Sequence, residues 1–160
     1  MSNIVTLGVY QITFQGKTCV DNLQTWTYTV VQLAPSPPGQ EISHWILGLC
    51  PDPPHQVIAF TGPDGSTVEI GGGNPCLPDQ DRTIRWEDLS NANVEGEYTF
   101  TLLGCFEETQ VPVAVKVGRG NGSCINPAEG DPATITGPSC DQIIIPEPPD
   151  TGGVRGVKQA

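Results

Sequence analysis

The sequence predicts an all-β protein, an antiparallel β-sandwich with extended termini, and three observations lead to this fold class. First, apolar residues alternate with polar ones at a period of two, which suits a half-buried strand and not an amphipathic helix. Second, 19 glycines and 16 prolines interrupt the 160-residue chain and supply turns between short segments. Third, six cysteines are spread along the chain, as in domains that are stapled by disulfides.

The expected strands follow one another along the chain. Residues 5–10 and residues 26–31 alternate between two faces, so one face of each strand is expected to be buried. Residues 42–50 are almost continuously apolar, which is typical of a central strand covered on both faces or lying at a sandwich corner. Further strands are expected over residues 56–60, 66–70, 83–86, 97–103, 111–117 and 142–145.

The connections carry the residues of tight turns. Proline- and glycine-rich segments are found at residues 34–39, 51–54, 62–65 and 120–122. One helical turn is expected at residues 86–89. About ten short strands with regular turns are typical of two packed antiparallel sheets, here expected to be of the jelly-roll or immunoglobulin-like kind.

The chain divides into three parts. Residues 1–9 form an N-terminal strand and possible connector, residues 10–145 form the sandwich domain, and residues 146–160 are a tail rich in proline and glycine. Two interpretations of each end are open. The first segment either extends this molecule's own sheet or completes the sheet edge of another copy, and the tail is either an unstructured end or a connector to a neighbouring subunit.

The charge of the chain excludes several partners. With 18 acidic and 7 basic side chains the net charge is −11, which repels nucleic-acid phosphates and anionic lipid headgroups. No apolar run approaches the roughly 18–20 residues of a membrane-spanning helix. We therefore expect neither a nucleic-acid partner nor a membrane span.

The cysteines are expected to form disulfides and not a metal site. The two closest, Cys124 and Cys140, are sixteen positions apart, whereas zinc ligands usually come in C-x₂₋₄-C pairs. Six cysteines allow fifteen pairings, and bonds within the chain or to other subunits are both open. The candidates are Cys19, Cys50, Cys76, Cys105, Cys124 and Cys140.

Disulfides indicate an oxidising compartment, yet residues 1–14 lack the basic start and apolar stretch of a secretion signal. Three explanations are open: a mature segment with an added methionine, release of the protein by cell lysis, or thiols that never oxidise.

No catalytic, cofactor-binding or metal-binding residue is expected. His44 and His55 are the only histidines, and neither belongs to a Ser/His/Asp arrangement, so His44 is expected to be hydrogen-bonded in the core or at a strand edge. The acidic residues 79–81 lack the glycine and the bidentate glutamate of a calcium loop.

The three tryptophans allow two interpretations. Trp26, Trp45 and Trp86 all lie in strand-like apolar patterns, so core packing explains them most simply. Exposed tryptophan faces would instead stack on sugar rings. In that case the chain would be a secreted carbohydrate-binding or adhesion module.

Two segments carry a resemblance to known proteins. Residues 42–50, ISHWILGLC, and residues 113–118, VAVKVG, resemble bacterial surface-exposed β-sandwich proteins. The cysteines, acidity and extended termini are similar to those of extracellular fibre and spore-appendage subunits. This resemblance implies a pilus-like homopolymer at the cell or spore surface, built by strand exchange or inter-subunit disulfides, with other copies as the main partner and other surface proteins or glycans as further ones. We therefore expect a non-enzymatic, self-assembling subunit of a fibre, appendage or surface layer.

Overall fold

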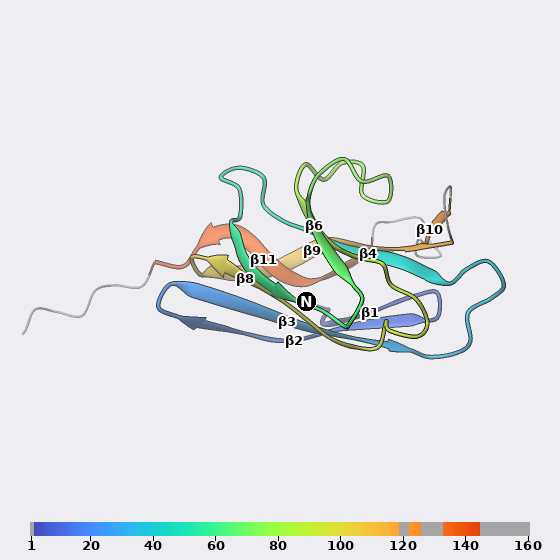
Figure 1. Cartoon of the computed structure of the whole chain (residues 1–160). Coiled ribbons are helices and arrows are strands. Elements are labelled where there is room, and N and C mark those ends of the chain that lie inside the picture. The colour runs from blue at the N-terminus through green and yellow to red at the C-terminus, as the bar shows by residue number, and fades with distance from the viewer. Residues whose placement is uncertain (1, 119–121, 126–132, 145–160) are drawn as a thin grey trace, which may run out of the picture.

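The predicted fold class is confirmed by a computed structural model, which describes residues 2–118, 122–125 and 133–144. Over these ranges every regular element is a strand, all strand pairs are antiparallel, and the strands form two facing sheets (Figure 1). No helix in the described ranges is long and apolar enough to cross a membrane.

The two sheets contain five and six strands. Sheet A has the order β1 (Ile4–Leu7), β2 (Tyr10–Val20), β3 (Leu23–Gln32), β8 (Gly96–Leu103) and β5 (Val57–Thr61). Sheet B has the order β10 (Ser123–Ile125), β9 (Phe106–Val117), β4 (Ile42–Gly48), β7 (Thr83–Glu87) and β6 (Thr67–Gly71), and β11 (Thr134–Gln142) pairs with the first half of β9.

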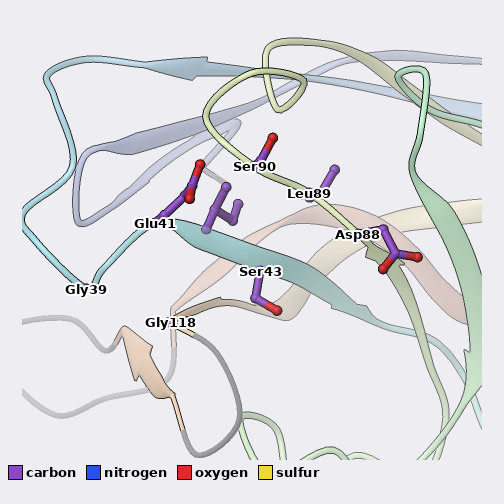
Figure 2. A pocket seen from close by; sticks show the side chains of 8 residues that line it. Gly39, Glu41, Ser43, Asp88, Leu89, Ser90 and Gly118 are labelled. Atoms are coloured by element: carbon purple, nitrogen blue, oxygen red, sulfur yellow. The ribbon is translucent and has the colours of Figure 1, made fainter.

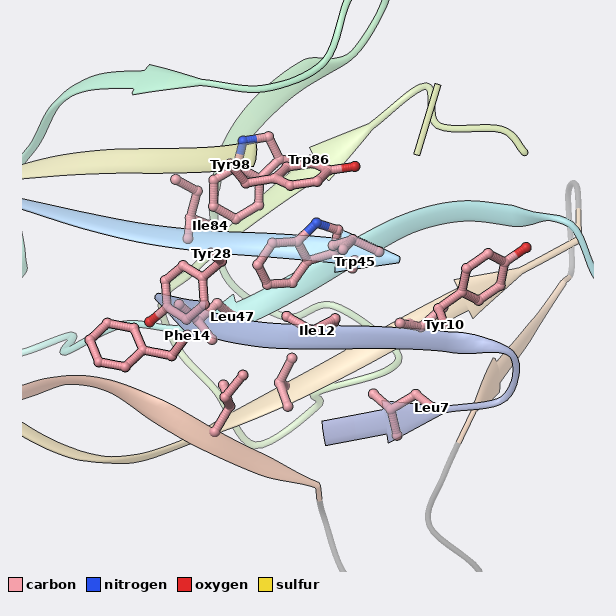
Figure 3. Close-up of a cluster of buried hydrophobic side chains, with 14 of the residues drawn as sticks. Leu7, Tyr10, Ile12, Phe14, Tyr28, Trp45, Leu47, Ile84, Trp86 and Tyr98 are labelled. Atoms are coloured by element: carbon pink, nitrogen blue, oxygen red, sulfur yellow. The ribbon is translucent and has the colours of Figure 1, made fainter. Parts of the chain in front are cut away.

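The core between the sheets is built from the inward-facing positions of the alternating strands, and it is rich in aromatic rings (Figure 3). Trp26, Trp45 and Trp86 are all 0% exposed, which confirms that they are core residues. Trp45 and Trp86 stack with ring centroids 4.6 Å apart, and Tyr98 meets both rings edge-on. Such aromatic pairs add about 0.5–1.5 kcal/mol each beyond the area that they bury.

Buried hydrogen bonds fix one sheet against the other. The Gln24 side chain of β3 is fully buried; its amide donates to the carbonyl of Phe106, and its oxygen accepts from Phe106 N and Trp26 Nε1, each at 2.9 Å. The Tyr28 hydroxyl donates to the Thr136 carbonyl at 2.8 Å. Because unpaired polar groups in a core are costly, these bonds specify the register of the two sheets.

The N-terminal region differs from the prediction. The first strand ends at Leu7, and a two-residue loop with Gly8 at φ +65° reverses the chain into β2, which the sequence did not predict. The strand expected over residues 5–10 was therefore too long, because Val9 continues the apolar alternation through the turn. The β1 strand extends this molecule's own sheet, and the Ser2 carbonyl accepts from Thr136 N at 2.9 Å.

Two further expectations were wrong, and one strand was missed. The last strand, expected over residues 142–145, is β11 and ends at Gln142, so the apolar residues that follow lie outside it. Residues 86–89 form no helical turn, because β7 continues to Glu87 and Asp88 takes a positive φ of 59°. The short strand β10 was not expected at all. The tail over residues 146–160 lies outside the described residues.

Candidate functional site

The six candidate cysteines form three disulfides, all within the chain. They join segments 86, 90 and 48 residues apart, with Cα–Cα distances of 6.0, 5.3 and 5.4 Å, in the pairs Cys19–Cys105, Cys50–Cys140 and Cys76–Cys124. No cysteine is left free, so the structure corrects the interpretation that some of them bond to other subunits. Three disulfides in a β-sandwich of this size fit a secreted or extracellular domain.

His55 has a structural position beside one of these disulfides. It is 1% exposed; its Nδ1 accepts from Cys50 N at 3.0 Å, and its Nε2 lies 2.9 Å from the Ser139 carbonyl. Since a carbonyl only accepts, Nε2 carries the proton and the ring is neutral. Burial lowers the pKa of His55, so the neutral ring that holds together the strands flanking Cys50–Cys140 is favoured.

The β5 strand is an open sheet edge. It lies at the end of sheet A, carries no charged residue, and leaves Ile58 51% and Phe60 49% exposed. Natural proteins usually protect an edge strand with charge, shortness or a covering segment. The other edges of the described sheets have such protection: Glu69 of β6 is ion-paired with Arg85, β10 is only three residues long, and the start of β1 is hydrogen-bonded to β11.

Exposed apolar side chains gather at the end of the sandwich where the β2–β3 hairpin turns. Leu23 bridges to Gly104, and Ile143 N donates to the Cys105 carbonyl at 2.7 Å, which brings the ends of four strands together. We call this group the apolar end; its members are Val20, Leu23, Leu103, Ile143 and Ile144, exposed by 64, 37, 46, 38 and 88%. Contiguous exposed apolar surface commonly marks an interaction site.

A pocket of about 590 Å³ with polar and charged residues in its lining lies on the outer face of sheet B. The loop over residues 72–82 forms one wall, held down by the packing of Leu77 on that face and by the Cys76–Cys124 disulfide. We call this hollow the His44 pocket; it is lined by Ser43, His44, Asn74, Pro75, Cys76, Arg85, Glu87, Asp88, Lys116, Gly122 and Cys124.

A second hollow, of about 640 Å³, adjoins the His44 pocket and shares Ser43 and Asp88 with it. It lies between the start of β4, the loop after β7 and Gly118 at the end of β9, and Figure 2 shows its lining residues. Glu41 at its edge is already hydrogen-bonded, since its carboxylate accepts from Asn91 N at 2.8 Å.

His44 is the least expected residue of the pocket. It is 7% exposed, and its Nε2 has no hydrogen-bond partner among the described residues, although a hydrogen-bonded ring was expected. Burial, reinforced by the positive charges of Arg85 and Lys116, lowers the pKa of His44 to about 4. The ring is therefore neutral at physiological pH, with one nitrogen buried and available for a hydrogen bond.

Two rows of side chains across sheet B build the pocket floor, and the sequence did not reveal them. On one side of β4, His44 is paired with Lys116 of β9. On the other side, Trp45 is paired with Trp86 of β7, so the next residue of β7, Glu87, lies beside His44. Arg85 pairs with both Glu87 and Glu69. These residues are far apart in the chain, so only the strand register brings them together.

Within the described ranges, no three His, Cys, Asp or Glu side chains are grouped so that they could hold a metal ion.

Comparison with known proteins yielded no relative: no family model, no curated protein and no solved structure matches the chain. The class defined by the fold and its cysteines is a disulfide-stapled β-sandwich of the kind found in oxidising environments.

Proposed function

We propose that the chain is a non-enzymatic structural subunit of an extracellular fibre, appendage or surface layer, and that its copies join by adding a strand to β5. The observation that carries this proposal is the open, uncharged β5 edge with Ile58 and Phe60 half exposed. The three internal disulfides support it, because a subunit stapled within itself keeps its shape in an oxidising exterior while non-covalent contacts join it to its neighbours.

Strand addition to β5 gains both hydrogen bonds and buried apolar area. One side of β5 pairs with β8, and no described strand pairs with the other. Each new backbone hydrogen bond contributes about 0.5–1.5 kcal/mol net. Covering the exposed halves of Ile58 and Phe60 adds roughly 1 kcal/mol for each side chain, so a short strand is sufficient for reversible pairing.

The C-terminal segment of a neighbouring copy is the proposed donor strand. Its start at Ile143 is anchored to Cys105, and the next residue, Ile144, is 88% exposed. Leu103 N donates to the Gln56 carbonyl just before β5, and Ile143 N donates to the carbonyl of nearby Cys105, so β5 begins at the same end of the sandwich as Ile143 and Ile144. The residues that follow this anchor begin with Ile144 and Ile145, and β-branched side chains of this kind pair well in a sheet.

The test compares a variant of the β5 edge with a matched control by sedimentation velocity and electron microscopy. The double variant Ile58→Lys, Phe60→Lys places positive charge on the β5 edge. We expect this variant to stay monomeric while the unmodified chain assembles. Val31→Lys is the control, because Val31 is 41% exposed but lies on the central strand β3. Assembly of the β5 variant to the same extent as the control would contradict the proposal.

The alternative function, carbohydrate binding through exposed tryptophan rings, has no tryptophan available to it. Trp26, Trp45 and Trp86 are fully buried, so none offers a face for a sugar ring.

A further inference from the structure

We propose that the His44 pocket binds a neutral saccharide, because the pocket places a buried imidazole, whose Nε2 has no partner among the described residues, beside hydrogen-bond donors and acceptors whose charges cancel. The site is on the outer face of sheet B, whereas the β5 edge belongs to sheet A, so this inference does not depend on assembly.

The backbone around the pocket departs from regular strand geometry at two points. The register between β4 and β9 shifts between Ile42 and His44, a bulge with Ser43 as the extra residue. Ile42 faces the core, so without the bulge His44, two residues later, would face it as well; the bulge turns the ring to the outer face. Asp88 at the pocket rim has a positive φ of 59°, which is uncommon for a residue other than glycine. Such features often re-aim side chains at binding sites.

The unpartnered nitrogen of His44 points to a hydrogen-bonding ligand. A buried polar atom without a partner costs free energy, and native structures contain few of them. The neutral ring has one donor and one acceptor nitrogen. A sugar hydroxyl both donates and accepts, so it pairs with Nε2 of His44 in either tautomer.

The charges that line the pocket exclude strongly ionic ligands. Among the described lining residues, Arg85 and Lys116 carry two positive charges, and Glu87 and Asp88 carry two negative ones, so these four charges cancel. Arg85 is already paired with two carboxylates, which disfavours capture of an anion. The positive charges beside His44 equally disfavour a metal ion.

The remaining groups suit several hydroxyls held at once. Ser43 adds a hydroxyl and Asn74 an amide NH₂, since the Asn74 oxygen already accepts from Cys76 N at 2.8 Å; one Asp88 oxygen already accepts from Thr67 Oγ1 at 2.7 Å, which leaves the other as an acceptor. The Cys76–Cys124 disulfide fixes the opposite wall, so the pocket is formed before the ligand arrives. Because the second hollow continues from Ser43 and Asp88, the site has room for more than one sugar ring.

The test is a titration of the full, disulfide-intact chain with neutral disaccharides, followed by ¹H–¹⁵N NMR. Cellobiose, maltose, lactose and N,N′-diacetylchitobiose are the probes, and a uronate-containing disaccharide is the charged comparison. We expect at least one neutral probe to shift the His44 imidazole nitrogens and the amides of Asn74 and Lys116. His44→Ala and Asp88→Gly should each weaken binding about tenfold, the effect of one lost hydrogen bond.

The control variant is Gln15→Ala, on the other sheet, which should bind as the unmodified chain does. If His44→Ala does not fold, Asp88→Gly decides, because glycine accepts the positive φ at that position. The proposal is overturned if no neutral disaccharide shifts His44, if only the uronate does, or if Asp88→Gly binds as tightly as the control.

Discussion

Acid should destabilise this protein before its carboxylates are protonated, and His44 should account for much of the effect. In the folded chain the pKa of His44 is about 4, against 6.5 for an unperturbed histidine. As the pH falls below 6.5 the unfolded chain takes up a proton that the folded chain refuses, so the unfolded state is increasingly favoured. This contribution to stability is fully present above pH 6.5 and is lost as the pH falls to about 4. Each tenfold difference in proton affinity is worth about 1.4 kcal/mol, so the two pKa values correspond to a total loss of about 3.5 kcal/mol, most of it between pH 6.5 and 4.

The assay is urea unfolding of the unmodified chain and of His44→Gln over that pH range. The side chains that face the ring are Arg85 and Glu87 of β7, Lys116 of β9 and Glu69 of β6, and all four are kept in the variant. We expect the unmodified chain to lose about 3 kcal/mol more than His44→Gln between pH 6.5 and about 4. Equal losses in the two proteins, or an NMR titration that places the His44 pKa near 6.5, would refute the reasoning.

Two further predictions concern the hydrogen bonds of Gln24 and the Cys19–Cys105 disulfide, which join the two sheets. Gln24→Met removes the side chain that pairs with Phe106 N, the Phe106 carbonyl and Trp26 Nε1, so the free energy of unfolding should fall by about 3 kcal/mol or more. The control Gln15→Met, at an exposed position, should change it by less than about 0.5 kcal/mol. Equal effects of the two variants in urea unfolding would contradict the role of Gln24. Replacing Cys19 and Cys105 by serine removes the disulfide that joins residues 86 positions apart, and the free energy of unfolding should fall by roughly 2–5 kcal/mol. The thermal midpoint should therefore be lower. An unchanged midpoint would show that this disulfide does not stabilise the domain.

Much of the fold was predictable because the core is made by simple alternation. Strands such as β3 and β8 place every second side chain in the core, so their sequences alone identify them. The β2 strand was missed because its alternation breaks at a bulge between Phe14 and Gly16 and its second half is largely exposed. The last strand was misplaced because the apolar residues Ile143 and Ile144, which look like a strand, are the exposed ones.

The pocket was not predictable from local pattern. Nothing in the sequence around Ser43 announces the bulge that turns His44 outward, and simple alternation places Ile42, His44 and Ile46 on one face. The partners of His44 come from β7 and β9, so their proximity depends on register, which no single segment encodes. The cysteine pairs were open for the same reason, because each joins segments at least 48 residues apart.

The central claim, that β5 receives a strand from a neighbouring copy, is tested most directly by hydrogen–deuterium exchange on the assembled and the dilute protein. We predict that amides of residues 57–61 exchange more slowly in the assembled state, because strand addition pairs the free side of β5. The edge strand β6, which carries the ion-paired Glu69, should exchange at the same rate in both. Slower exchange at β6 with no change at β5 would contradict the account.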